Sequence, residues 1–149
     1  MNKIFLIMIT VALLSSNLFS QQSEKHRSFI TINDVWARPG VKNANSAIYL
    51  VIQNSSSIAD TILGAKSKHA EIVEIHESFK RDNDRMGMRQ VKFVKAAAKS
   101  KLEFKPGGFH IMLIGLLKDY SIGNSFDVTI NFKHAGKIKV KALVREMNN

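Results

Sequence analysis

Histidine and methionine side chains recur at spacings that could build a metal site on a β-sheet. His110 and Met112 lie two residues apart in the segment PGGFHIML, and Met86 and Met88 form a second pair with the same spacing. Side chains two residues apart on a strand point to the same face, so each pair would present two donors to one face. With His76 nearby, four or five soft or borderline ligands could converge.

The chemistry of these donors favours a soft monovalent metal. Calcium and magnesium prefer oxygen ligands, and zinc rarely accepts a thioether. Thioether sulfur selects Cu(I), and imidazole is tolerated beside it. The chain contains no Cys, so Met and His must supply any soft-metal chemistry, and a thiolate nucleophile is excluded.

The same residues also have simpler interpretations, which the spacing leaves open. Met112 lies in the apolar run IMLIGL and could fill the core, where a flexible thioether adapts to irregular space. A histidine on a strand, such as His76 or His110, is often a hydrogen-bonded residue at the rim of a sheet.

The first twenty residues differ from the rest of the chain. Lys3 precedes an apolar run from Ile4 to Leu14, and small and polar residues follow as far as Ser20. This layout predicts a cleaved secretory signal peptide over residues 1–20. The alternative is a membrane anchor, but the apolar run is shorter than the roughly 20 residues that span a bilayer. We therefore expect export and no stable membrane anchor after cleavage.

The chain is strongly basic, with a net charge of +10 that becomes +9 once Lys3 is removed with the signal peptide. Basic proteins can meet nucleic acid, anionic membranes or acidic proteins. Export separates the protein from nucleic acid, so we expect no nucleic-acid partner. The charge then indicates either a solvated basic surface or electrostatic steering toward an acidic protein.

Apolar residues follow the pattern of β-strands from residue 29 onward. They alternate with polar residues in SFDVTINF and KIKVKALV, and a period of two marks half-buried strands. Turn signals such as RPG, PGG and HAG separate such runs. The one helix-like stretch, residues 94–101, is too short to favour a helix. We predict an all-β sandwich or barrel of about eight or nine strands over residues 29–149. A flexible N-terminus at 21–28 is expected to precede it. Trp36 is expected to be an anchor in the core or at its rim.

A longer pattern resembles the signature of the PCuAC family of periplasmic copper chaperones. That family's motif is His, an optional Met, ten residues, Met, twenty-one residues, His, one residue and Met. Here His76, Met88, His110 and Met112 agree with every interval. The flanking strings VWARP, SAIYLVIQN and FKHAGKIKV also match, so the resemblance covers nearly the whole predicted mature chain.

The resemblance implies a cupredoxin-like Greek-key β-sandwich, which agrees with the strand pattern. Carried over by position, it implies copper ligands at His76, Met88, His110 and Met112. It further implies a periplasmic chaperone, not an enzyme, that holds Cu(I). The implied acceptor is the binuclear copper site of cytochrome c oxidase subunit II or a related respiratory oxidase.

Residues beside the implied ligands have several possible roles. The optional Met of the motif is Glu77 here, which leaves Met86 as a candidate for an outer or alternate ligand. Glu74 and Glu77 flank His76, and either could orient its imidazole, although a solvated carboxylate is the simpler expectation. Of the remaining histidines, His69 is the first candidate to touch metal. All three are expected to be solvated: His26, His69 and His134.

A second interpretation comes from a different class of protein. An envelope interaction module with a β-sandwich fold and no metal fits the composition and the strand pattern equally well. A Cu(I) titration would separate the two. An enzyme is not expected, because the chain has no Cys nucleophile, no Gly-rich phosphate loop and no serine elbow motif.

Overall fold

Strands make up most of the molecule. The computed structural model describes residues 29–147, and within that range it has ten β-strands and one short 3₁₀ turn, η1 (Asp82–Asp84). The strands are β1 (Ile30–Ala37), β2 (Ser46–Asn54), β3 (Asp60–Lys66), β4 (Ala70–Lys80), β5 (Met86–Gln90), β6 (Val94–Ala96), β7 (Ser100–Phe104), β8 (Phe109–Leu116), β9 (Ser125–Phe132) and β10 (Lys137–Val144). The predicted signal peptide at 1–20 and the N-terminal segment at 21–28 lie outside the described residues.

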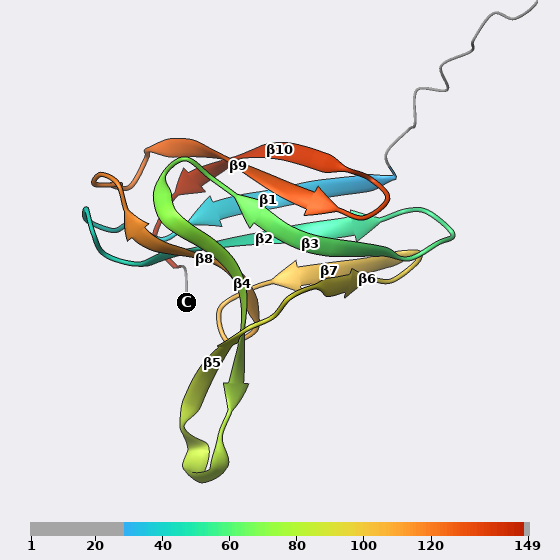
Figure 1. Cartoon of the computed structure of the whole chain (residues 1–149), viewed down its shortest axis with the longest axis horizontal. Helices are drawn as coiled ribbons and strands as arrows, with labels where there is room; N and C mark the ends of the chain where they lie inside the picture. Colours follow the sequence, from blue (N-terminus) through green and yellow to red (C-terminus); the bar gives the residue numbers. More distant parts are fainter. Residues whose placement is uncertain (1–28, 148–149) are drawn as a thin grey trace, which may run out of the picture.

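The strands form one hydrogen-bonded sheet that folds over into two facing layers (Figure 1). Its order is β5-β4-β8-β7-β2-β1-β10-β9-β3-β6, with an additional pairing of β8 with β2. Ile111 of β8 and Val128 of β9, far apart in that order, belong to the same buried cluster. The two halves of the sheet therefore pack face to face, which confirms the predicted all-β sandwich.

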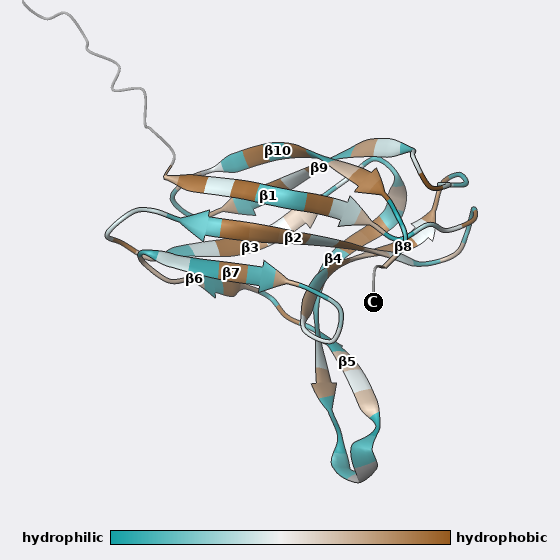
Figure 2. Ribbon diagram, turned by 180° about the vertical axis from the view of Figure 1, so that it is seen from behind, coloured by the Kyte–Doolittle hydropathy of each residue, from teal (hydrophilic) through white to brown (hydrophobic). Residues whose placement is uncertain are grey.

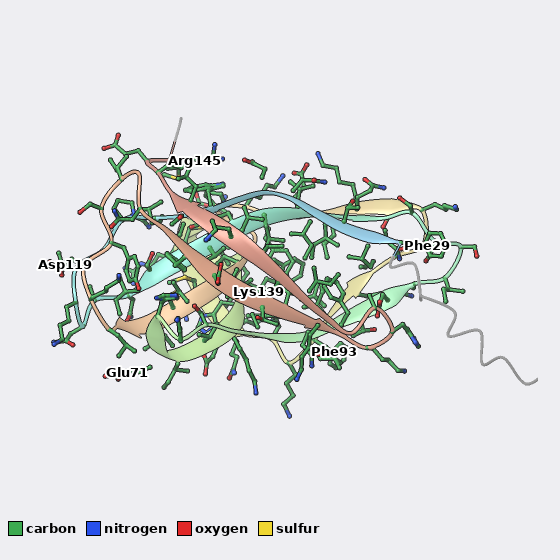
Figure 3. All side chains as sticks on the ribbon, turned by 90° about the horizontal axis from the view of Figure 1, so that it is seen from above. Phe29, Glu71, Phe93, Asp119, Lys139 and Arg145 are labelled. Atoms are coloured by element: carbon green, nitrogen blue, oxygen red, sulfur yellow. The ribbon has the colours of Figure 1, made fainter. Side chains whose placement is uncertain are left out.

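The core follows from the period of two along the strands. In β9, Phe126, Val128, Ile130 and Phe132 are buried and alternate with residues that are more exposed. The colouring in Figure 2 shows a similar alternation of apolar and polar residues along β1, whereas most of β2 is apolar. In the view of Figure 3, side chains fill the space between the strands. Lys139, which is labelled there, lies on β10 and its side chain is 65% exposed. Burial of these apolar faces is the main stabilising contribution to the fold.

The number of strands differs from the sequence-based expectation, and the structure of residues 94–101 makes that expectation more specific. The described residues hold ten strands rather than eight or nine, because β5 and β6 are too short to leave a clear alternation. Residues 94–101 form no helix: β6 occupies the start of this segment and β7 begins at Ser100. Val94 and Ala96 are buried in the core, and the Asn54 side-chain amide donates a hydrogen bond to the Ala96 carbonyl at 3.1 Å. Within residues 29–147, no helix is long and apolar enough to cross a membrane.

One hairpin leaves the sandwich. Strand β4 has eleven residues, and its second half pairs with β5 beyond the body of the sheet. In Figure 1 this hairpin projects away from both layers. Its register places His76 opposite Gln90 and Ser78 opposite Met88. The hairpin therefore carries predicted site residues at the point where it leaves the sandwich.

Candidate metal centre

Strand β8 sends its side chains alternately into the core and onto the outer face of the sheet. Ile111 and Leu113 belong to the buried core. His110 and Met112 alternate with them and therefore lie on the opposite face. Met112 is only half-buried and lies outside the core cluster, so the interpretation of this residue as core filler is wrong.

Antiparallel pairing of β4 with β8 brings the two predicted histidine ligands together. His76 lies directly opposite His110, and their ring centroids are 5.9 Å apart. Glu74 lies opposite Met112 in the same register. Directly opposed residues have Cβ atoms about 5 Å apart, so residues separated by 34 positions in the chain become immediate neighbours.

Met88, His110 and Met112 line one cavity of about 350 Å³. Strand β5 contributes Met88, whose side chain is 57% exposed, and β8 contributes the other two. His76 is not among the residues that line this cavity, although its ring lies beside that of His110. The structure thus gathers three of the four predicted ligands around one cavity and places the fourth next to it.

The turn before β8 orients the His110 ring. The Nδ1–H of His110 donates to the carbonyl of Gly108 at 3.1 Å, which leaves the lone pair on Nε2. The same carbonyl accepts the backbone N–H of Ser78 at 3.1 Å and so ties the turn to β4. Gly107 in this turn has φ +80°, a conformation that glycine adopts without strain.

The surroundings of His110 favour its neutral imidazole form. Burial lowers its pKa, and the nearby His76 lowers it further, whereas the Gly108 hydrogen bond acts in the opposite direction. Imidazole must be neutral to bind a metal, so burial favours the form of His110 that can serve as a ligand.

Glu74 fixes the orientation of the His76 ring through the opposite nitrogen, Nε2. The Nε2 of His76 lies 2.7 Å from Oε2 of Glu74, and the carboxylate accepts its N–H. The lone pair then lies on Nδ1, which is buried and has no hydrogen-bond partner among the described residues. The expectation that Glu74 is merely solvated is wrong, since it contacts the imidazole directly.

The second flanking carboxylate has a different role. Glu77 accepts hydrogen bonds from the Nε and Nη2 atoms of Arg89 at 3.0 and 2.7 Å, across the β4–β5 hairpin. Met86, the predicted alternate ligand, is 61% exposed on β5 and does not line the cavity. Neither side chain is placed to contact a metal in the cavity.

Tyr49 of β2 forms part of the wall of the site, and Trp36 of β1 packs against Tyr49. Tyr49 lines the cavity and lies 6.2 Å from the His110 ring, centroid to centroid. Its other neighbour is Trp36, at a centroid distance of 4.5 Å. Both are buried in a small cluster of their own with Ala47, separate from the main core, so Trp36 is the anchor that was predicted. Burial raises the pKa of Tyr49, so its phenol adds no charge to the site.

A third sulfur also lines this cavity, and the sequence motif did not point to it. Met147, three residues beyond β10, is a lining residue together with Met88, His110 and Met112. In the sequence, only the fact that residue 147 is a methionine could have indicated a donor, because it lies too far along the chain from the other donors for a strand period to relate them. Only the fold brings it there.

The two remaining histidines within the described residues, His69 and His134, do not line the cavity. His134 is exposed in the β9–β10 turn, as predicted. His69 is not solvated: it is partly buried, its Nδ1 is hydrogen-bonded to the Tyr120 hydroxyl, and its ring packs 5.2 Å from that of Phe126. Burial is the main cause of its lowered pKa. His26 lies outside the described residues.

The donor set fits a soft ion. Among residues 29–147, no three His, Asp or Glu side chains form a group that could hold a metal. A metal bound at this cavity would therefore need thioether sulfur, which favours Cu(I) over zinc or hard cations. The buried Nδ1 of His76, which has no partner among the described residues, supports a metal at this site, because leaving such an atom unsatisfied costs about 1–3 kcal/mol.

Comparison with known proteins adds two findings on sequence. The family model described as "Putative lipoprotein LpqE-like" matches residues 30–144, which is nearly all of the described chain. "Putative lipoprotein Lxx21020" of Leifsonia xyli subsp. xyli is 23% identical over 129 residues, covering 87% of this chain and 77% of that protein.

Solved structures resemble the fold as a whole. The structure titled "Copper-bound PCuAC domain from PmoF2" superposes with a TM-score of 0.67 at 22% identity, covering 80% of this chain and 94% of that one. The solution structure of CuI-DR1885 from Deinococcus radiodurans has a TM-score of 0.59 at 20% identity, covering 84% and 85%. The predicted cupredoxin-like Greek-key sandwich is therefore confirmed as the fold.

Proposed function

This chain belongs to the LpqE-like family, and we propose that it is a periplasmic copper chaperone that binds Cu(I) through His76, Met88, His110 and Met112. The observation that carries the proposal is the common cavity lined by Met88, His110 and Met112, with His76 beside it. Solved structures of the same fold are described as binding copper, in one case as CuI.

The orientation of the two imidazoles supports a shared metal. Glu74 leaves Nδ1 of His76 as the lone-pair atom, and the Gly108 carbonyl leaves Nε2 of His110 in that role. Hydrogen bonds of this kind to the second nitrogen are typical of metal-binding histidines, because they fix the tautomer and the orientation of the ring. Two thioethers complete a neutral ligand set that suits Cu(I).

Exposure of the site supports delivery rather than storage. Met88 is more than half exposed and lies on a hairpin that projects from the sandwich. An acceptor's ligands can therefore approach the ion while Met88 leaves it, and copper passes by ligand exchange without any redox or covalent step. The acceptor in this proposal is the binuclear copper site of cytochrome c oxidase subunit II or a related oxidase, reached after export by the signal peptide at residues 1–20.

Titration of the purified protein with Cu(I) against a competing chelator tests the proposal. We expect one tightly bound Cu(I) per chain, and loss of that binding in the double variant His110→Ala, Met112→Ala. The matched control is His134→Ala with Met86→Leu, which removes one exposed histidine and one exposed thioether outside the cavity. Circular dichroism should show an intact β-sandwich in both variants.

Two outcomes would contradict this function. If the wild-type protein does not compete with the chelator, the envelope interaction module without metal becomes the better interpretation. If the control variant loses Cu(I) as completely as the site variant, copper binds elsewhere on the surface.

A further inference from the structure

The segment that follows the last strand runs toward the copper cavity. Strand β10 ends at Val144, which pairs with Ala37 of β1. The backbone N–H of Arg145 then donates to the Ala37 carbonyl at 3.0 Å, which extends this parallel pairing by one residue. Figure 3 shows Arg145 at the edge of the molecule, in the half away from Phe29, and in Figure 1 the ribbon continues from β10 toward β8.

Side-chain contacts hold Arg145 against Trp36, which packs on a residue that lines the cavity. Its guanidinium lies 4.9 Å from the centre of the Trp36 ring and donates a hydrogen bond to Asp34 at 2.9 Å. Trp36 stacks on Tyr49, and Tyr49 lines the cavity. The chain is therefore fixed two residues before Met147, at a point already next to the metal site.

Met147 reaches the cavity from this anchored point. It lines the same space as Met88, His110 and Met112, and it is 46% exposed. A large apolar side chain half in solvent gains little from burial, so packing alone gives a weak account of its position. A thioether beside two other thioethers and an imidazole has a clear chemical role, because each is a neutral donor that Cu(I) accepts.

We propose that Met147 is a third thioether ligand, which covers bound Cu(I) from the C-terminal segment. The inference rests on the proposed function and goes beyond its ligand set. Residues 145–147 belong to no strand, so Met147 can leave the ion without breaking a strand–strand hydrogen bond. It is therefore suited to retain copper in the free chaperone and to give way first when an acceptor's ligand enters.

X-ray absorption and chelator competition on Met147→Leu test this assignment. Leucine keeps the apolar bulk of the side chain and removes only the sulfur. We expect Met147→Leu to bind one Cu(I) with one fewer sulfur neighbour than wild type and with an affinity about tenfold or more lower, as for other losses of metal-site partners. The matched control is Met86→Leu, which removes an exposed thioether from the same hairpin as Met88 and should change neither quantity.

The outcomes separate this inference from the function on which it rests. If wild type binds one Cu(I) and Met147→Leu has the same sulfur count and affinity, the ligand assignment is overturned while the chaperone proposal stands. If Met147→Leu weakens binding with an unchanged sulfur count, the residue only packs over the site, and the assignment is again overturned. A wild-type protein that binds no Cu(I) overturns both.

Discussion

At the scale of single residues, hydrogen bonds outside the ligand set decide which atoms can bind a metal. The two histidines use opposite nitrogens: a carboxylate holds Nε2 of His76, and a backbone carbonyl holds Nδ1 of His110. Each ring therefore has one defined lone pair, and the one on His76 is buried without a partner among the described residues. A preset tautomer removes the need to reorganise the ring when a metal binds.

Glu74 should be a positioning residue for copper. In Glu74→Gln the neutral amide is a weaker acceptor for the His76 N–H, so the ring loses a charge-assisted hydrogen bond and part of its donor strength. We expect Cu(I) affinity to fall about 10- to 100-fold, with the number of nitrogen and sulfur neighbours unchanged. Chelator competition measures the affinity, and X-ray absorption measures the neighbours.

The neighbouring carboxylate provides the control for that experiment. Glu77→Gln removes the same charge three residues away, from a side chain that pairs with Arg89 rather than with the imidazole. Its Cu(I) affinity should stay close to wild type. An equal loss in both variants would mean that carboxylate charge, not orientation of the ring, sets the affinity.

At the scale of elements, the site depends on strands that pair far from one another in the chain. Strand β8 lies between β4 and β7 and also pairs with β2. Antiparallel register then places His76 against His110 and Ala47 of β2 against Met112. The β4–β5 hairpin adds Met88. A shift of one residue in the β4–β8 register would turn His76 toward the core, because neighbouring side chains on a strand face opposite ways.

Asp60 joins two other elements and should contribute strongly to stability. It is buried at the start of β3, and its carboxylate accepts backbone N–H groups of Thr61, His134 and Ala135 at 2.6–2.9 Å. Asp60→Ala leaves the Thr61 donor of β3 and the two donors of the β9–β10 turn without their partner, so we expect a loss of about 2–3 kcal/mol in the free energy of unfolding. Denaturant titration measures it. Asp127→Ala, which removes a surface carboxylate paired only with lysines, should have a much smaller effect.

The contribution of Asp60 to the free energy of unfolding should decrease as the pH falls. Burial alone would raise its pKa, but the hydrogen bonds from His134, Ala135 and Thr61 together lower it below the ordinary value. A group with a depressed pKa in the folded state contributes stability above its unfolded pKa of about 3.9 and loses that contribution as pH falls through its folded value. The stability difference between wild type and Asp60→Ala should therefore narrow below about pH 4. A difference that widens in acid would contradict the assignment.

At the scale of the whole molecule, copper and the fold should be thermodynamically linked. The four ligands of the sequence motif span residues 76–112 and come from β4, β5 and β8, so they converge only in the folded chain. A ligand that binds only the folded state stabilises it by mass action. The metal would then add to a chain that has no disulfide, since it has no Cys.

Thermal unfolding with and without Cu(I) checks this linkage. At free Cu(I) of about 100 times its Kd, the folded state should gain about 2.7 kcal/mol, equivalent to a rise in Tm of several degrees for a domain of this size. The double variant His110→Ala, Met112→Ala should show no rise. Equal shifts in both proteins would indicate binding outside the cavity.

The sequence alone determined the strand character and the motif, because these can be found by alternation and by counting along the chain, and it determined the fold through the family resemblance that the motif carries. Alternation in β9 and β10 predicts which residues face the core, and the intervals between His76, Met88, His110 and Met112 can be counted along the chain. Only the tertiary structure decided which face of β8 carries the site. It also decided that Glu74 rather than Glu77 holds His76, and that Met147 reaches the cavity. These depend on the register and ends of strands paired across long stretches of chain, which no local pattern specifies.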